Sequence, residues 1–153
     1  MNDDIVALAK LRLEEILSFY GLNVSVKAVV NESAIELSVE TDSTGHLIGR
    51  HGETLAALQQ LLNAIVRAHT TEHVYVSLDI GEYKKGRADQ LSEQAHIDAK
   101  NVIETGTIKR LRPMTPAERR IVHMALADYP EIATESEGEG RERRVVIKRR
   151  KTE

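Results

Sequence analysis

Leu47-Ile48-Gly49-Arg50-His51-Gly52-Glu53-Thr54-Leu55 is the stretch that decides the fold of the first half of the chain. Two glycines enclose Arg50 and His51 and stand between two segments of helical character. Glycine permits left-handed backbone angles and a close approach by another molecule. Arg50, together with backbone N–H groups at the start of the following helix, favours an anion such as phosphate. Most glycine pairs at this spacing are ordinary turns or helix caps, so the surrounding elements decide how the pair is interpreted.

Apolar periodicity predicts the elements on both sides of this stretch. Residues spaced by three or four predict helices, and strict alternation predicts strands with one wet face. The predicted elements are a helix over 3–20, strands over 24–30 and 35–39 with a turn at 31–33, a short helix capped by Ser43 or Thr44, a long helix after Gly52 and a strand over 73–80. The order is therefore helix, strand, strand, helix, helix, strand.

A third long helix is predicted over 84–105, and the boundary between two domains, 1–82 and 83–153, is placed near Glu82. Three cations at the start of this helix lie at the unfavourable positive end of the helix dipole. They are Lys84, Lys85 and Arg87. Their position indicates either a phosphate contact or simple solvation.

Thr115-Pro116-Ala117-Glu118 predicts the start of another helix, because a threonine N-cap, a proline at the first helical position and a glutamate three residues later form a capping box. This start fixes the register, so Arg119 and His123, four residues apart, share one helix face. The rest of the chain is predicted as a short strand over 132–134, an acidic loop over 135–140 and a strand over 143–148 flanked by basic residues.

The charge of the chain is distributed unevenly. The 153 residues carry a net charge of −3, yet residues 1–83 hold 5 Lys and Arg against 12 Asp and Glu, a net of −7, while residues 84–153 hold 16 against 12, a net of +4. The halves are therefore expected to face partners differently. With no cysteine, signal peptide or long apolar run, the sequence fits the cytosol and predicts no membrane insertion.

The order of elements around Ile48-Gly49-Arg50-His51-Gly52 resembles a type II KH domain, which binds single-stranded nucleic acid. The resemblance implies that Gly49 and Gly52 contact the sugar–phosphate backbone, and that Leu47, Ile48 and Leu55 line an apolar groove for bases. Core packing is the alternative for each of these three apolar residues. Because Arg50-His51 supplies one formal charge in an acidic half, binding by this domain alone is expected to be weak.

The Arg119–His123 pair, placed before a strand rich in Arg and Val, resembles the R-3-H domain, a small fold also associated with single-stranded nucleic acid. Contact with RNA is implied for both residues; the alternative is that His123 packs on Arg119 and the sheet. The combination with a KH domain is similar to the bacterial Jag family of SpoIIIJ-associated (KhpB, EloR) proteins. The implied fold class is α+β, a type II KH domain (α-β-β-α-α-β) followed by a small α/β R-3-H domain with an antiparallel sheet. Additional basic contacts are expected from Lys84, Lys85, Arg87, Arg120, Arg143 and Arg144.

The resemblance implies a cytoplasmic RNA-binding protein, an RNA chaperone linked to cell elongation, cell shape and envelope synthesis. Its expected partners are single-stranded RNA or DNA, a small stand-alone KH protein and a second copy of itself. Many relatives carry an additional N-terminal Jag domain, which this chain is expected to lack because Asp3 already begins the KH helix. The alternative is a protein-interaction scaffold that dimerises or docks an envelope-synthesis partner without binding RNA strongly.

Catalysis and cofactor binding find little support in the sequence. His69 and His73 are four residues apart, but they straddle a helix end and a strand, whereas a zinc site needs three or four converging ligands. No pairing of carboxylates and no Ser/His/Asp arrangement can be assigned by spacing. The sequence therefore predicts no enzyme, no metal and no cofactor.

Overall fold

The computed structural model describes residues 3–22, 24–31 and 34–150. The chain divides into two compact units, Met1–Lys84 and Lys85–Glu153. This division falls two residues after the predicted boundary.

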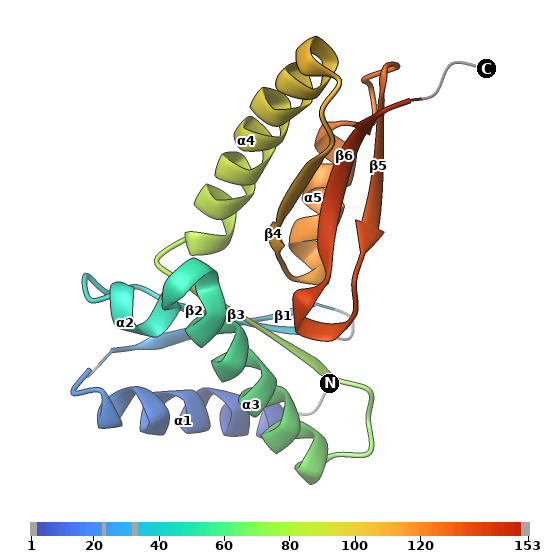
Figure 1. Ribbon diagram of the computed structural model, residues 1–153. Coiled ribbons are helices and arrows are strands. Elements are labelled where there is room, and N and C mark those ends of the chain that lie inside the picture. The colour runs from blue at the N-terminus through green and yellow to red at the C-terminus, as the bar shows by residue number, and fades with distance from the viewer. Residues whose placement is uncertain (1–2, 23, 32–33, 151–153) are drawn as a thin grey trace. The chain divides into compact units, whose positions relative to one another are not determined.

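The first unit has the predicted order of helices and strands (Figure 1). Its elements are α1 (Asp3–Phe19), β1 (Val26–Asn31), β2 (Ala34–Val39), α2 (Gly45–Ile48), the 3-10 turn η1 (Arg50–Gly52), α3 (Glu53–His69) and β3 (Tyr75–Ile80). Thr44 is the N-cap residue of α2, as predicted, although its side chain makes no capping hydrogen bond. The predicted turn at 31–33 falls largely on residues 32–33, which lie outside the described part of the chain.

A three-stranded sheet in the order β1-β2-β3 forms the floor of this unit. β1 and β2 are antiparallel, and β2 and β3 run parallel. Alternate residues along β2 and β3 are buried beneath α1 and α3, and those between them are exposed or half-buried (Figure 1). This arrangement is the type II KH topology, and the alternation predicted from the sequence is confirmed.

Side-chain amides of α3 close the outer edge of β3. Asn63 is 3% exposed, and its amide donates to the Val76 carbonyl (2.7 Å) and accepts from the Val76 N–H (2.9 Å). Gln59 accepts from the Leu78 N–H at 3.0 Å. Two amides of one helix thereby take the place of a fourth strand along this edge.

The second unit packs two helices on an antiparallel sheet whose strand order is β4-β6-β5 (Figure 1). Its elements are α4 (Tyr83–Thr105), whose first residues belong to the first unit, β4 (Lys109–Pro113), α5 (Pro116–Ala125), β5 (Ile132–Glu137), the 3-10 turn η2 (Gly140–Glu142) and β6 (Arg144–Arg149). Small and branched side chains make the core, among them Leu91, Ala95, Ala99, Val102, Val122, Val145 and Ile147. The expected α+β fold with an antiparallel second sheet is confirmed.

Two details of this unit differ from the sequence-based expectation. β4 was not predicted, because only Leu111 among its five residues is apolar and partly buried. The acidic loop predicted over 135–140 is wrong in its first half, because β5 continues to Glu137 through pairing with β6. Cross-strand partners therefore determine strand positions that the local sequence does not indicate.

Candidate nucleic-acid interface

The loop between α2 and α3 is built from left-handed backbone. The φ angles are 70° at Gly49, 54° at His51 and 83° at Gly52. His51 is one of two described non-glycine residues with positive φ, a conformation that histidine tolerates better than most side chains do. Arg50 and His51 are both exposed, so the turn carries them at its tip.

Both glycines are required by contacts inside the first unit. A Cβ atom on Gly49 would lie 2.1 Å from the Thr54 hydroxyl oxygen, and one on Gly52 would lie 2.9 Å from a ring carbon of Tyr83. Replacing either glycine would disturb the turn itself as well as any bound molecule. Substitutions of Arg50 and His51 therefore test binding at this loop with less disturbance of the turn.

The apolar residues expected to line a groove lie mainly in the core. Leu47 is fully buried and Leu55 is 5% exposed. Leu47 and Leu55 therefore both belong to the core of this unit, the arrangement named as the alternative, and a contact of either with a base stays a prediction. Ile48 is half-buried and packs against that core. The helical period identified these residues as apolar neighbours but did not indicate what covers them.

The N-terminus of α3 lies beside this loop, and its first N–H group, that of Glu53, donates to the Arg50 carbonyl. Gly52 occupies the N-cap position of the 17-residue helix, and no side chain makes a capping hydrogen bond there. The first N–H groups of a helix lack intrahelical acceptors, and the helix dipole adds partial positive charge at this end. Together with the Arg50 guanidinium, they form a setting suited to an anion.

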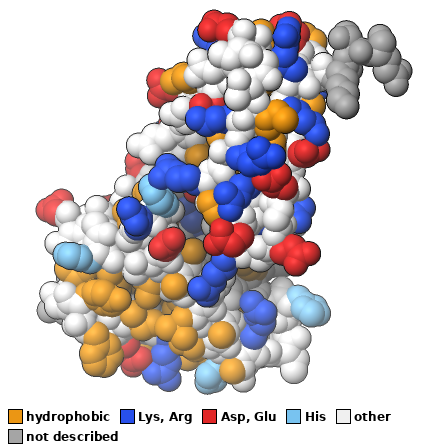
Figure 2. All heavy atoms as spheres, in the orientation of Figure 1, with side chains coloured by type: hydrophobic (Ala, Val, Ile, Leu, Met, Phe, Trp, Pro, Cys, Tyr) orange, Lys and Arg blue, Asp and Glu red, His pale blue; other side chains and the backbone are white. Residues whose placement is uncertain are grey.

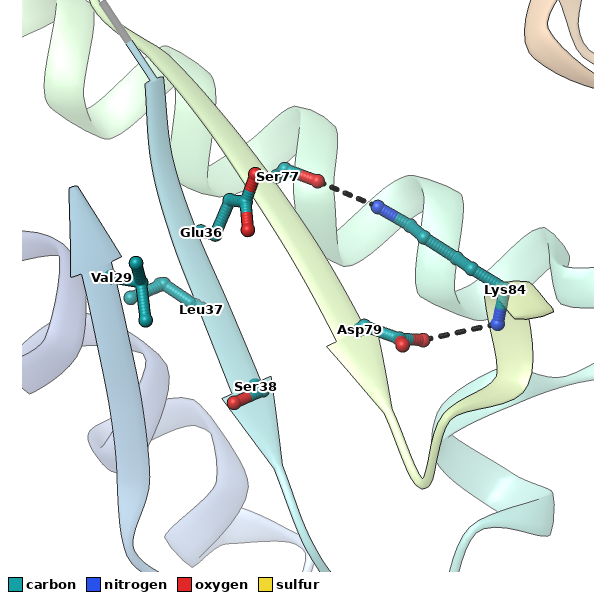
Figure 3. A pocket seen from close by; sticks show the side chains of 7 residues that line it. All are labelled: Val29, Glu36, Leu37, Ser38, Ser77, Asp79 and Lys84. Atoms are coloured by element: carbon teal, nitrogen blue, oxygen red, sulfur yellow. Dashed lines mark hydrogen bonds between the residues drawn. The ribbon is translucent and has the colours of Figure 1, made fainter. Parts of the chain in front are cut away.

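Lys84 lies over a hollow on the open face of the first sheet (Figure 3). Its ammonium donates to Ser77 Oγ (2.8 Å) and to Gln59 Oε1 (3.2 Å), and its backbone N–H donates to Asp79 Oδ1 at 3.1 Å. Partial burial lowers the pKa of Lys84, and the carboxylates of Asp79 and Glu36 oppose that shift. Its ammonium is therefore held on the sheet, although Lys84, like its neighbour Lys85, is an exposed residue.

Arg87 contributes to the framework of the second unit. Its Nε donates to Glu118 Oε1 at 2.8 Å, and the two side chains are 16% and 14% exposed. Glu118 also accepts from the Thr115 N–H through its other oxygen, at 2.9 Å. Arg87 thereby ties the N-terminal part of α4 to the start of α5, which accounts for an arginine near the unfavourable end of the helix dipole.

The capping box of α5 forms as predicted. The Thr115 hydroxyl accepts from the Glu118 N–H, and the Glu118 carboxylate accepts from the Thr115 N–H. Arg119, one residue further on, donates from Nη1 to the Met114 carbonyl at 2.9 Å and is half-buried. One terminal nitrogen of the Arg119 guanidinium is therefore bonded to the segment that precedes α5.

His123 connects α5 to β5. Its Nδ1 lies 2.7 Å from Thr134 Oγ1, and its Nε2 lies 3.1 Å from Ser136 Oγ. Partial burial lowers the pKa of His123, and the nearby Arg119 guanidinium lowers it further. A neutral ring donates through one nitrogen and accepts through the other, and each hydroxyl can supply the complementary group. Both ring nitrogens therefore have partners within the unit.

The remaining predicted contacts lie on the second unit. Arg120 is exposed on α5. Arg143 donates to the Gly138 carbonyl at 3.2 Å, and Arg144 pairs with Glu142 at 3.1 Å. Thr134 and Ser136, the partners of His123, were not predicted as site residues. The feature of the sequence that could have indicated them is the alternation of hydroxyl side chains with Glu135 and Glu137 along β5.

Among the described residues no group of three or more potential metal ligands converges, and no helix there is long and apolar enough to cross a membrane.

Comparisons with known proteins agree with this architecture. A family model described as the KH domain of KhpA/KhpB matches residues 10–78, and a model of the R-3-H domain matches residues 89–149. Neither model describes an enzyme. Proteins named RNA-binding protein KhpB are similar to this chain in several bacteria, and three of them define the relationship.

The KhpB of Lactiplantibacillus plantarum is 40% identical over 115 residues, which is 75% of this chain and 36% of that protein. The KhpB of Clostridium symbiosum is 34% identical over 137 residues, 88% of this chain and 62% of the relative. The KhpB of Bacillus subtilis is 30% identical over 146 residues, 94% and 70% of the two chains. The chain belongs to the KhpB family, and it spans about a third to two thirds of the length of these relatives.

Proposed function

We propose that this member of the KhpB family binds single-stranded RNA through the loop between α2 and α3 and through the start of α5. The observation that carries the proposal is the loop itself, where Arg50 and His51 are exposed beside the N-terminus of α3, which no side chain caps. Backbone donors and one guanidinium suit a phosphate of the RNA backbone. The names of the relatives, RNA-binding proteins, support the same ligand.

In the second unit, we assign the contact to Arg119 and a supporting role to His123. The imidazole is occupied on both sides by hydroxyls of β5, whereas the contact of Arg119 with Met114 uses one guanidinium nitrogen. A guanidinium has five N–H donors and binds phosphate oxygens in pairs. The His123 ring positions α5 on the sheet, and Arg119 contacts the RNA.

In the cell, we place this RNA binding in the cytoplasm as an RNA-chaperone activity linked to cell elongation and envelope synthesis, as the resemblance to the Jag family implies. A small stand-alone KH protein and a second copy of the chain are the proposed protein partners. These assignments rest on family resemblance, and the loop geometry supports the RNA contact alone.

A titration of a fluorescein-labelled single-stranded oligoribonucleotide followed by anisotropy tests the loop. Arg50→Gln with His51→Asn removes the charge and the ring, and asparagine tolerates the left-handed angle at position 51. Loss of a charge-assisted contact is expected to weaken binding about tenfold. The matched control is Arg67→Gln with His69→Asn, an exposed Arg/His pair at the opposite end of α3.

Equal affinity in the loop variant and the control would contradict a contact at the loop. Circular dichroism of both variants should match the parent chain, because all four side chains are exposed. A parent chain without measurable affinity for any oligoribonucleotide would overturn the proposed function as a whole.

Protein docking by the first unit is a second candidate function, favoured by exposed apolar side chains. Phe19 is 90% exposed, Leu11 and Tyr20 are 51% exposed, and Leu61 is 47% exposed. Hydrophobic side chains gather on the visible face of this unit (Figure 2). Sedimentation of the chain across a concentration series tests self-association, and Phe19→Ser with Leu61→Ser is expected to shift any dimer toward monomer.

A further inference from the structure

The second sheet has a face that points away from the two helices packed on it. Val145 and Ile147 of β6 are fully buried in the core with α4 and α5. Successive side chains of a strand point to opposite faces. Arg144, Val146 and Lys148 therefore lie on the other face of the sheet.

The strand register places further charges on this face. Arg110 of β4 and Glu135 of β5 lie opposite Val146 on its two sides. Glu137 lies opposite Arg144 in the same way. Directly paired residues share a face. We call the set Arg110, Arg144, Lys148, Glu135 and Glu137 the outer charged face.

Carboxylates hold the cations of this face in exposed ion pairs. Lys148 Nζ lies 2.7 Å from Glu135 Oε2, with side chains 38% and 55% exposed. Arg110 Nε lies 3.1 Å from Glu137 Oε1, with side chains 59% and 40% exposed. Exposed pairs of this kind contribute about 0–1 kcal/mol each. Such contacts can be exchanged for another anion at little cost.

The Arg87–Glu118 pair of the same unit shows the opposite case. Its side chains are 16% and 14% exposed, and its carboxylate also caps α5. Breaking a pair at this depth leaves an uncompensated charge. The exposed pairs of the outer charged face differ from it in both burial and the absence of a capping role.

We propose that the outer charged face binds the sugar–phosphate backbone of single-stranded RNA, with Arg110 and Lys148 exchanging Glu137 and Glu135 for phosphates. The two glutamates serve as internal counter-ions that compete with the RNA and limit its affinity. This inference rests on the proposed RNA binding and adds a surface separate from the loop and from Arg119. Cations and carboxylates are interspersed over the visible surface of this unit (Figure 2).

The chemistry of the face favours a phosphate backbone over bases. None of the residues of β4, β5 and β6 is aromatic, so the face offers no platform for base stacking. Guanidinium and ammonium groups on neighbouring strands instead offer contacts to successive phosphates. The face should therefore add salt-dependent affinity without base preference.

The experiment measures the affinity of the full chain for a fluorescein-labelled single-stranded oligoribonucleotide of mixed sequence at several salt concentrations. Arg110→Gln with Lys148→Gln is expected to weaken binding several-fold and to reduce the slope of log K against log salt by about 1.4, since each single-strand phosphate contact contributes about 0.7. Glu135→Gln with Glu137→Gln is expected to strengthen binding about three- to tenfold, because the competing carboxylates are gone.

Two controls separate this face from net charge. Arg67→Gln with Lys100→Gln removes the same two kinds of cation from exposed helical sites, and Glu93→Gln with Glu104→Gln removes two exposed carboxylates from α4. Each control is expected to change affinity less than the matching variant of the outer charged face. The opposite signs of the two face variants distinguish phosphate exchange from a purely structural role.

Affinities equal to those of the controls would overturn this inference. If the Arg50/His51 variant binds RNA more weakly than the parent chain and the Arg110/Lys148 variant binds it equally well, the proposed function stands. The outer charged face is then excluded from the RNA contact. If the parent chain binds no RNA, the proposed function and this inference both fail.

Discussion

Backbone angles hold the candidate loop of the first unit, whereas side-chain hydrogen bonds hold the candidate contacts of the second. Gly49, His51 and Gly52 all have positive φ, and a Cβ on either glycine would meet Thr54 or Tyr83. In the second unit, Glu118 caps α5 and His123 bonds two hydroxyls of β5. The first arrangement is intolerant of a single added carbon atom. The second is a set of separate contacts, each of which can be weakened by itself.

The two units also differ in net charge. Counting from the sequence to the division at residue 84, the first unit has 6 Lys and Arg against 12 Asp and Glu, and the second has 15 against 12. The loop therefore presents Arg50 in an acidic unit, and the second unit presents many cations that its own carboxylates hold. Neither net charge is strongly positive, so the proposed RNA binding must also depend on local geometry.

The largest effect is expected from Gly49→Ala. The new Cβ would lie 2.1 Å from the Thr54 hydroxyl oxygen at a φ of 70°, so the variant should lose about 3 kcal/mol of stability. Urea denaturation followed by circular dichroism measures this loss. Gly86→Ala is the control, because no atom lies within 4 Å of its Cβ position and alanine favours the helix. An unchanged midpoint for Gly49→Ala would show that the loop relaxes freely, and the contrast between the units would disappear.

His123→Ala should have the next largest effect on stability. It removes hydrogen bonds to Thr134 and Ser136, each worth about 1 kcal/mol. The denaturation midpoint should fall in proportion to a loss of about 2 kcal/mol, while His73→Ala, at an exposed site, serves as the control. A normal midpoint combined with a large loss of RNA affinity would instead make His123 a direct contact.

Arg119→Lys should change affinity more than stability. Lysine keeps the charge but cannot bind two phosphate oxygens with a planar fork, so affinity for the oligoribonucleotide is expected to fall about fivefold, close to 1 kcal/mol. Arg67→Lys on α3 is the control, because that exposed side chain is not among the predicted RNA contacts. Equal affinities for the two variants would remove Arg119 from the interface.

The smallest effect concerns the pH dependence of stability. The pKa of His123 is lowered from 6.5 in the folded chain by partial burial and by Arg119, so the unfolded chain binds the proton more readily. The stability from the neutral ring is therefore fully present above about pH 6.5 and is lost as the pH falls through the folded pKa. Denaturation at pH 7.5 and 5.5 should show a smaller decrease for His123→Gln than for the parent chain. An equal decrease in both proteins would assign it to other groups.

The sequence predicted those features that depend on neighbouring residues. Thr115, Pro116 and Glu118 lie within four positions, so their capping box could be recognised without knowing the fold, and the structure confirms it. The glycine pair likewise identified the turn between α2 and α3. Alternation over β2 and β3 correctly indicated a sheet with one buried face.

The missed features depend on residues far apart in the chain. β4 has a single partly buried apolar residue, and its strand character comes from pairing with β6 more than thirty positions later. The role of His123 depends on Thr134 and Ser136, which lie on another element. Leu47 was expected in a groove because of the resemblance to a KH domain, and the burial of its side chain in the core depends on residues distant in the sequence. Predictions for Arg50, His51 and Arg119 as RNA contacts stay predictions.

The amides of Asn63 and Gln59 along β3 also limit how the first sheet can associate with other sheets. Growth by strand addition needs free N–H and C=O groups along an edge, and at Val76 and Leu78 those groups are already bonded to α3. Edge-to-edge association of two copies is thus left to β1, the strand at the other end of the sheet. A contact between two β1 edges is symmetric and uses up both. The sheet is consequently suited to a closed pair and unsuited to an open-ended fibre.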